Sequence, residues 1–214
     1  MKHTLSALVL SLGLLVPALA SAQELGSKGD AIFSVDRLMG ITGAHRITEL
    51  PGPPGDVEED TTNISFGWRG PLHPSPFEVP RFAFDYLVID HLSIGGSLGY
   101  ASIAHDDPNY DESFFLLHAR VGYLYSFGKV VAIWPRGGVT YHSYKLDDDG
   151  ESGDSGFALT IECPFTFSPT QHFAFHVGPS FDFDMFGEYD PEVGPDIDRR
   201  YRSVGLNAGI LGWF

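Results

Sequence analysis

The chain has 214 residues, of which 13 are Lys or Arg and 28 are Asp or Glu, giving a formal net charge of −15. This length suits one domain, or one domain with a small appendage. The 25 glycines and 15 prolines argue against a helical bundle or coiled coil, because both residues destabilise helix interiors. An aromatic content of 14% is too high for a disordered chain, and the negative charge excludes a general nucleic-acid binder.

Residues 1–22 have the pattern of a secretory signal peptide. Lys2 gives a basic start, an apolar stretch follows, and Ala20-Ser21-Ala22 offers small residues for cleavage. A membrane anchor is the alternative, but the apolar stretch is shorter than the roughly 20 residues that span a bilayer. We therefore expect a signal peptide over 1–22 and a single exported domain over 23–214.

Apolar and less apolar residues alternate with a period of two through most of the remaining chain, which indicates β-strands. The predicted strands, in chain order, are 31–42, 81–89, 92–104, 113–126, 130–144, 157–167, 173–185 and 203–214. Thr61–Trp68 has the same pattern, but a ninth strand would place the two ends of the chain on opposite sides. We interpret it as an extension of the second strand, interrupted by the Pro-rich stretch 71–80.

Short and long connections alternate between these strands. The short ones are predicted at 89–91, 126–129 and 168–172, and the long polar ones at 43–80, 105–112, 145–155 and 187–199. This arrangement predicts eight antiparallel strands in up-and-down order, with both chain ends on the side of the short turns.

The character of the two strand faces indicates where the protein resides. A soluble barrel would carry many Lys, Arg and Glu side chains on its exterior, whereas here one face is strongly apolar and the other is small and sparsely polar. That is typical of a barrel with lipid outside. Aromatic residues near strand ends fit an interfacial girdle: Tyr100, Tyr123, Tyr125, Tyr141 and Trp213. We predict an all-β fold, an eight-stranded antiparallel up-and-down transmembrane β-barrel, too narrow for a broad channel.

The last predicted strand ends at Phe214, which looks like the assembly signal of bacterial outer-membrane barrels. The chain resembles the small eight-stranded barrels typified by OmpX and the OmpA membrane domain. Its stretches 80–86 and 134–138 are similar to those of uncharacterised myxobacterial outer-membrane barrels. The resemblance implies a monomer in the bacterial outer membrane, in contact with outer-membrane lipids and the barrel assembly machinery. It supplies no catalytic motif.

The predicted long loops hold most of the acidic residues. The densest set is Asp147, Asp148, Asp149, Glu151 and Asp154. Clustered carboxylates are ligands for divalent cations, so these loops are candidates for cation binding. The alternative is a solvated, flexible surface loop, and the set lacks the ligand spacing of an EF-hand. We assign no defined metal site.

Enzymatic chemistry has little support in the sequence. His118, His142 and His176 are predicted to point into the barrel, whereas a lipid hydrolase would need catalytic groups on the lipid-facing side. Tyr141-His142-Ser143, near the outer rim, keeps the enzyme hypothesis open. Cys163 is predicted on the lipid face as a small apolar residue. We expect no catalytic residue and no cofactor.

Charged residues inside the barrel give the most specific hypothesis. A hairpin centred near residue 128 would place Arg120 opposite Arg136, both pointing inward. Two facing guanidinium groups need compensation. Glu162, at similar depth on the next strand, is the first candidate, and Asp85 is the second. We predict a polar plug of these four residues, with an arginine pair solvated by interior water as the alternative. The plug predicts that Glu162→Gln lowers stability and raises conductance.

Three functional classes remain open. The first is a structural or interactive role in the envelope, with acidic loops exposed to cations, surfaces or partners. The second is a small pore or carrier for ions or small solutes, and the third is an enzyme acting on outer-leaflet lipid. Large, paired interior side chains would favour a plug, whereas a ring of Gly, Ser and Asn would favour a path.

Overall fold

The computed structural model describes residues 25–50, 55–67, 75–103, 111–128, 130–148, 150–191 and 197–214. The predicted signal peptide lies outside these residues. Almost all the secondary structure that they form is β-strand, with one short 3-10 helix, η1 (Pro76–Glu78). None of the described residues belongs to a helix long and apolar enough to cross a membrane.

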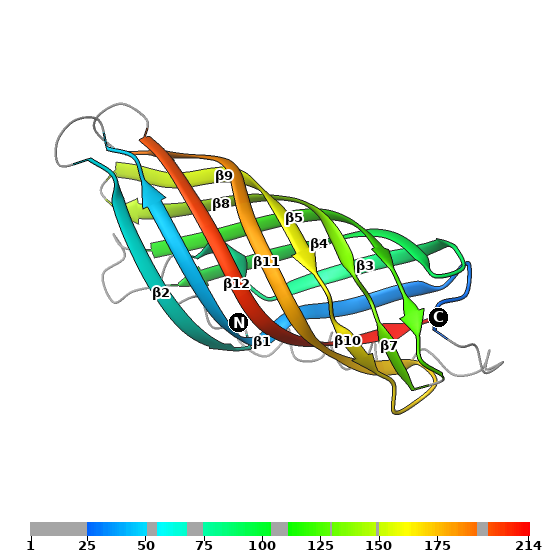
Figure 1. Ribbon diagram of the computed structural model, residues 1–214. Coiled ribbons are helices and arrows are strands. Elements are labelled where there is room, and N and C mark those ends of the chain that lie inside the picture. The colour runs from blue at the N-terminus through cyan, green and yellow to red at the C-terminus, as the bar shows by residue number, and fades with distance from the viewer. Residues whose placement is uncertain are drawn as a thin grey trace, which may run out of the picture.

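The strand segments form one closed antiparallel barrel of eight strands, which confirms the predicted fold class (Figure 1). The segments are β1 (Ala31–Thr48), β2 (Val57–Phe66), β3 (Arg81–Ile89), β4 (Leu92–Ile103), β5 (Asp111–Tyr123), β6 (Tyr125–Ser126), β7 (Val131–Ile133), β8 (Arg136–Asp148), β9 (Gly150–Glu162), β10 (Phe165–Phe167), β11 (Phe173–Asp190) and β12 (Ile197–Trp213). β12 pairs with both β11 and β1, which closes the barrel.

The second strand of the barrel consists of two segments. The first six residues of β1 pair with β3, and its last ten pair with β2, so β3 and β2 lie in succession beside the same strand. This confirms the interpretation of 61–66 as an extension of the second strand. Between the two segments, residues 75–80 are all buried and carry η1, which contacts β5 and β8 inside the barrel.

The predicted pairing of Arg120 with Arg136 is wrong. Arg120 pairs with Gly138, and Arg136 pairs with Gly122. The turn is centred one residue later than expected, since the backbone N–H of Phe127 donates to the carbonyl of Val131. A shift of one residue in the centre of a hairpin changes every cross-strand partner by two positions, so both arginines still point inward.

Three of the predicted long loops are shorter than expected. β1 continues to Thr48, β8 to Asp148 and β11 to Asp190, and β9 begins at Gly150. The sequence analysis ended the strands where apolar residues give way to polar ones. That change marks the level at which a strand leaves the apolar exterior, whereas the ladder of backbone hydrogen bonds continues beyond it.

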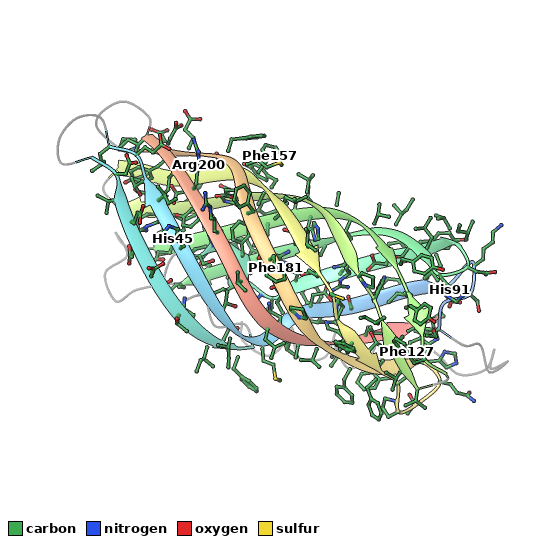
Figure 2. The ribbon with its side chains drawn as sticks, in the orientation of Figure 1. His45, His91, Phe127, Phe157, Phe181 and Arg200 are labelled. Atoms are coloured by element: carbon green, nitrogen blue, oxygen red, sulfur yellow. The ribbon has the colours of Figure 1, made fainter. Side chains whose placement is uncertain are left out.

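The exterior of the barrel is apolar, as the alternation predicted. Phe82, Leu117 and Ile161 are 60%, 52% and 50% exposed, while the residues before and after each of them are buried or less exposed. Phe157 and Phe181 point away from the wall in Figure 2. A closed barrel leaves no backbone edge along its paired strands, so an apolar exterior of this kind is suited to lipid.

Phe214 lies at the seam where β12 meets β1. Its backbone N–H donates to the Ala31 carbonyl (3.1 Å), and its carbonyl accepts from the Ala31 N–H (3.0 Å). Its ring lies 6.3 Å from that of Phe33 and 6.3 Å from that of His172. Phe214 therefore contributes both backbone bonds and a ring to barrel closure.

Deleting Phe214 should reduce the fraction of folded, heat-modifiable barrel in the outer membrane without changing export or signal cleavage. Phe214→Ala keeps the backbone bonds to Ala31 and removes the ring, so it separates recognition of the ring from closure of the seam. Phe33→Ala, which removes the neighbouring ring, is the matched control. Equal folded fractions in the wild type and in the deletion variant would contradict the predicted assembly role.

Candidate functional site in the barrel interior

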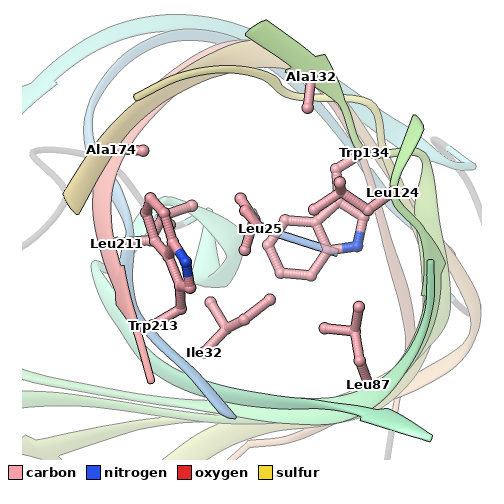
Figure 3. Packing of buried hydrophobic residues seen from close by; sticks show 9 residues of the cluster. All are labelled: Leu25, Ile32, Leu87, Leu124, Ala132, Trp134, Ala174, Leu211 and Trp213. Atoms are coloured by element: carbon pink, nitrogen blue, oxygen red, sulfur yellow. The ribbon is translucent and has the colours of Figure 1, made fainter. Parts of the chain in front are cut away.

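An apolar layer fills the barrel at the end of the short turns. Its members are Leu25, Ile32, Leu87, Leu124, Ala132, Trp134, Ala174, Leu211 and Trp213. Each is at most 8% exposed, and their side chains point toward one another across the lumen (Figure 3). Leu25 precedes the first strand and lies among residues that the strands contribute, so the N-terminal segment helps to close this end. Short turns face the periplasm in outer-membrane barrels, so we call this the periplasmic layer.

A charged layer follows, and it contains the four residues of the predicted plug. Arg120 lies 2.5 Å from Asp85, and the Arg136 Nε lies 2.9 Å from the Glu162 Oε2. All four residues are at most 5% exposed. Glu162 is the direct cross-strand partner of Arg136 in the β8–β9 ladder. These contacts place the four predicted side chains in one cluster.

Gly95 makes the contact between Asp85 and Arg120 possible. Asp85 and Arg120 lie on β3 and β5, and each pairs with Gly95 of the intervening β4. A Cβ atom at Gly95 would come within 2.4 Å of the Asp85 Oδ1. Because glycine lacks that atom, the two side chains meet across the strand between them.

Asp36 and Arg37, which were not predicted from the sequence, are central to the charged layer. Arg37 lies 3.0 Å from Glu162 and 2.8 Å from Asp182, and Asp36 lies 2.5 Å from Arg120. Both residues are almost fully buried although they are consecutive. The β1–β12 register shifts between Val35 and Met39, and Arg37 has a positive φ of 54°. This bulge turns two neighbouring side chains to the same face.

Charges within the layer are closely matched. Three guanidinium groups form direct ion pairs with four carboxylates: Arg37, Arg120 and Arg136 with Asp36, Asp85, Glu162 and Asp182. Arg81, also buried, donates to the Phe77 carbonyl at 3.2 Å and forms no ion pair within the described part of the chain. Arg136 also stacks over Trp134 at 4.8 Å, which connects the charged layer to the periplasmic one. Ion pairs and hydrogen bonds offset much of the cost of burying these charges.

A second apolar layer lies on the extracellular side of the charges. It consists of Phe77, Val79, Ala101, Phe114, Leu116, Ala158 and Tyr201. Phe77 and Val79 come from the segment that folds into the barrel between β2 and β3. The Phe77 ring packs edge-on against His142 at 5.2 Å, and His142 is hydrogen-bonded to Asp184 at 2.9 Å. We call this the outer apolar layer.

The cavity found at the charged layer is small. The cavity beside Asp36, Arg136 and Glu162 has a volume of about 10 Å³. That is about the space that a single water molecule needs. His118, His142 and His176 point inward as predicted and are at most 4% exposed, which places them away from the lipid-facing surface.

The cation-binding hypothesis needs correction at Asp154. This residue lies in β9, not in a loop, and is 3% exposed. It accepts hydrogen bonds from Arg199 (3.0 Å) and from the Tyr201 hydroxyl (2.6 Å). Its carboxylate is therefore engaged inside the barrel mouth and not presented to solvent.

The other predicted cation ligands lie close to the β8–β9 turn. Asp147 and Asp148 belong to β8 and Glu151 belongs to β9, but their side chains, like Asp149 as a whole, lie outside the described residues. Within the described part of the chain, no three His, Cys, Asp or Glu side chains are placed to hold a metal ion.

Comparison with known proteins identifies the fold. No protein-family model matches the chain, and no curated protein matches its sequence. Similar solved structures include AlkL (TM-score 0.58, 11% identity, 93% of this chain and 95% of that one) and OprG from Pseudomonas aeruginosa (0.53, 10%, 88% and 97%). Neisserial surface protein A (NspA) is another (0.50, 14%, 88% and 99%). All three have the fold of small outer-membrane barrels, as the predicted resemblance implied. With its apolar exterior, this chain has the fold of an integral outer-membrane β-barrel.

Proposed function

We propose that the protein is a closed, monomeric outer-membrane barrel with a structural or interactive role in the envelope. The observation that carries this proposal is the filled lumen: an ion-paired layer lies between two apolar layers. Large, paired side chains therefore occupy the positions at which a ring of Gly, Ser and Asn would leave a path. In this role the barrel stabilises the membrane and presents its extracellular rim to lipids, cations or partners.

A non-catalytic role agrees with the placement of the candidate catalytic groups. His142 and Asp184 form a buried pair inside the barrel, so neither group reaches lipid or a soluble substrate. Insertion by the barrel assembly machinery and contact with outer-membrane lipids complete the proposal. The similarity of 80–86 and 134–138 to myxobacterial barrels stays a prediction.

Planar-bilayer recordings of the refolded wild-type protein test the closed lumen. We expect the current to stay at the baseline of the lipid bilayer, because each apolar layer alone excludes hydrated ions. NspA, AlkL or OprG refolded in the same lipid can serve as an insertion control. A steady current that scales with the amount of inserted barrel would overturn the proposal in favour of the pore.

A further inference from the structure

A polar hollow lies on the outside of the barrel wall, across the extracellular parts of β8, β9 and β11. Its volume is about 390 Å³, within the range of sites that bind small molecules. Besides the inward-facing Tyr144, Ser152 and Asp154, the hollow is lined by outward-facing side chains: Tyr141, Ser143, Lys145, Ser155, Glu188 and Asp190. They alternate along their strands with inward-facing residues such as His142 and Asp154, which are buried.

Strand pairing builds the hollow from two rows of residues. In the first row, Ser155 pairs with Ser143 on one side and with Glu188 on the other. In the second row, Gly153 pairs with Lys145 and Asp190. Because Gly153 has no side chain, the centre of the second row stays open between the Lys145 ammonium group and the Asp190 carboxylate. The ladder therefore holds these polar groups at fixed spacing on rigid strands.

A row of aromatic rings forms the lower edge of the hollow. The centroids of Phe115 and Tyr141 are 6.3 Å apart, those of Tyr141 and Phe157 are 5.2 Å apart, and those of Phe157 and Phe186 are 5.5 Å apart. Below this row the outward side chains of β8 and β9 are apolar, and above it they are polar. Aromatic rows of this kind mark the level of lipid headgroups. Figure 2 shows Phe157 pointing away from the wall at this level.

The chemistry of the hollow matches a sugar better than a phosphate. Serine hydroxyls donate and accept, the lysine donates and the carboxylates accept, so a polyhydroxylated ring finds partners on several sides. The Tyr141 ring adds an apolar face with a polar tip. Lys145 is the one cation in the lining, against the carboxylates of Asp154, Glu188 and Asp190. A phosphate there would meet more negative than positive charge.

We propose that this hollow binds the uncharged sugar headgroup of a glycolipid in the outer leaflet. The aromatic row contacts the upper part of the lipid, and the two polar rows hydrogen-bond the sugar. This inference deepens the proposed interactive role by naming the partner. It does not depend on the closed lumen: a conducting wild-type barrel would overturn the plug and leave this site untouched.

The test is a titration of the full refolded barrel in phosphocholine micelles with monoglucosyl dioctanoylglycerol. Binding is followed by NMR shifts of β8 and β9 amides. We expect saturable binding in the wild type and about tenfold weaker binding in Tyr141→Leu, which keeps an apolar side chain but loses the ring and hydroxyl. Asp190→Asn should also weaken binding, because it removes a charged acceptor. Heat modifiability verifies that each variant is folded.

Tyr86→Leu is the matched control, since Tyr86 is an exposed outward tyrosine on β3, three strands away from β8. It should bind the glycolipid as the wild type does. An equal loss in Tyr86→Leu would overturn the site, as would tighter binding of dioctanoyl phosphatidylglycerol than of the glycolipid. Binding of methyl glucoside as tight as that of the glycolipid would overturn the assignment to a lipid. Absence of saturable binding in the wild type would overturn the proposal as a whole.

Discussion

Replacing Glu162 with Gln should lower the free energy of unfolding by about 3 kcal/mol, because it removes a buried carboxylate that three guanidinium groups share. The Glu162 carboxylate lies 3.0 Å from Arg37 and 2.9 Å from Arg136, and Arg120 approaches it at 3.6 Å. All four side chains are at most 6% exposed, so solvent screens these charges weakly. Urea unfolding in lipid vesicles, followed by tryptophan fluorescence, measures the change.

The matched control is Glu59→Gln. Glu59 pairs with Arg46 near the extracellular rim, where the two side chains are 40% and 28% exposed. An ion pair so exposed contributes about 0–1 kcal/mol. A loss in Glu162→Gln no larger than that of Glu59→Gln would contradict the central role of the buried network.

The layered interior changes the expected effect of Glu162→Gln on conductance. The polar plug alone predicts that the variant conducts, because it is then the one obstacle in the lumen. With apolar layers on both sides of the charges, loss of one carboxylate should leave the current near baseline. The same variant thus tests whether the apolar layers close the lumen without an intact charged layer. A large rise in current would mean that they do not.

The inward face of the barrel was readable from the sequence because strands alternate strictly. Asp85, Arg120, Arg136 and Glu162 fall on inward positions of four different strands, and a barrel of eight strands is too narrow for them to stay apart. The contacts between them therefore follow from alternation and size. The exact cross-strand partners do not follow from alternation and size. Arg120 and Arg136, for example, pair with Gly138 and Gly122 and not with each other.

Asp36 and Arg37 were hidden because the bulge breaks the alternation. A period-two pattern assigns neighbouring residues to opposite faces, so it places at most one of them inside. A positive φ is unusual for arginine and costs of order 1–3 kcal/mol, which the surrounding ion pairs must offset. Two adjacent charges within an otherwise apolar strand were the available signal for such a bulge.

The outer apolar layer was missed for a different reason. Residues 71–80 are rich in proline and were interpreted only as an interruption of the second strand. The apolar residues Phe77 and Val79 within that stretch were the available signal, because Phe and Val side chains are more often buried than exposed. Short-range patterns do not tell whether a loop folds outward or into the lumen, because that depends on what the facing strands leave unfilled.

Phe77→Ala should lower the free energy of unfolding by about 3–5 kcal/mol, because it leaves a cavity in a fully enclosed apolar layer. The Phe77 side chain is 0% exposed and packs against His142. The backbone carbonyl that accepts from Arg37 at 2.7 Å is unaffected by the substitution, so the charged layer should persist. The current of this variant should accordingly stay at baseline.

Phe181→Ala is the control for the loss of a phenyl ring as such. Phe181 is 48% exposed on the lipid-facing side, where lipid chains replace the missing ring, so this variant should unfold with a smaller loss of free energy. Equal losses in the two variants would contradict the packing role of Phe77. The double variant Phe77→Ala, Glu162→Gln disturbs two of the three layers and leaves the periplasmic one. We expect its current to stay at baseline too, because the periplasmic layer alone excludes hydrated ions. Ion current in the double variant but in neither single variant would contradict that sufficiency of the periplasmic layer.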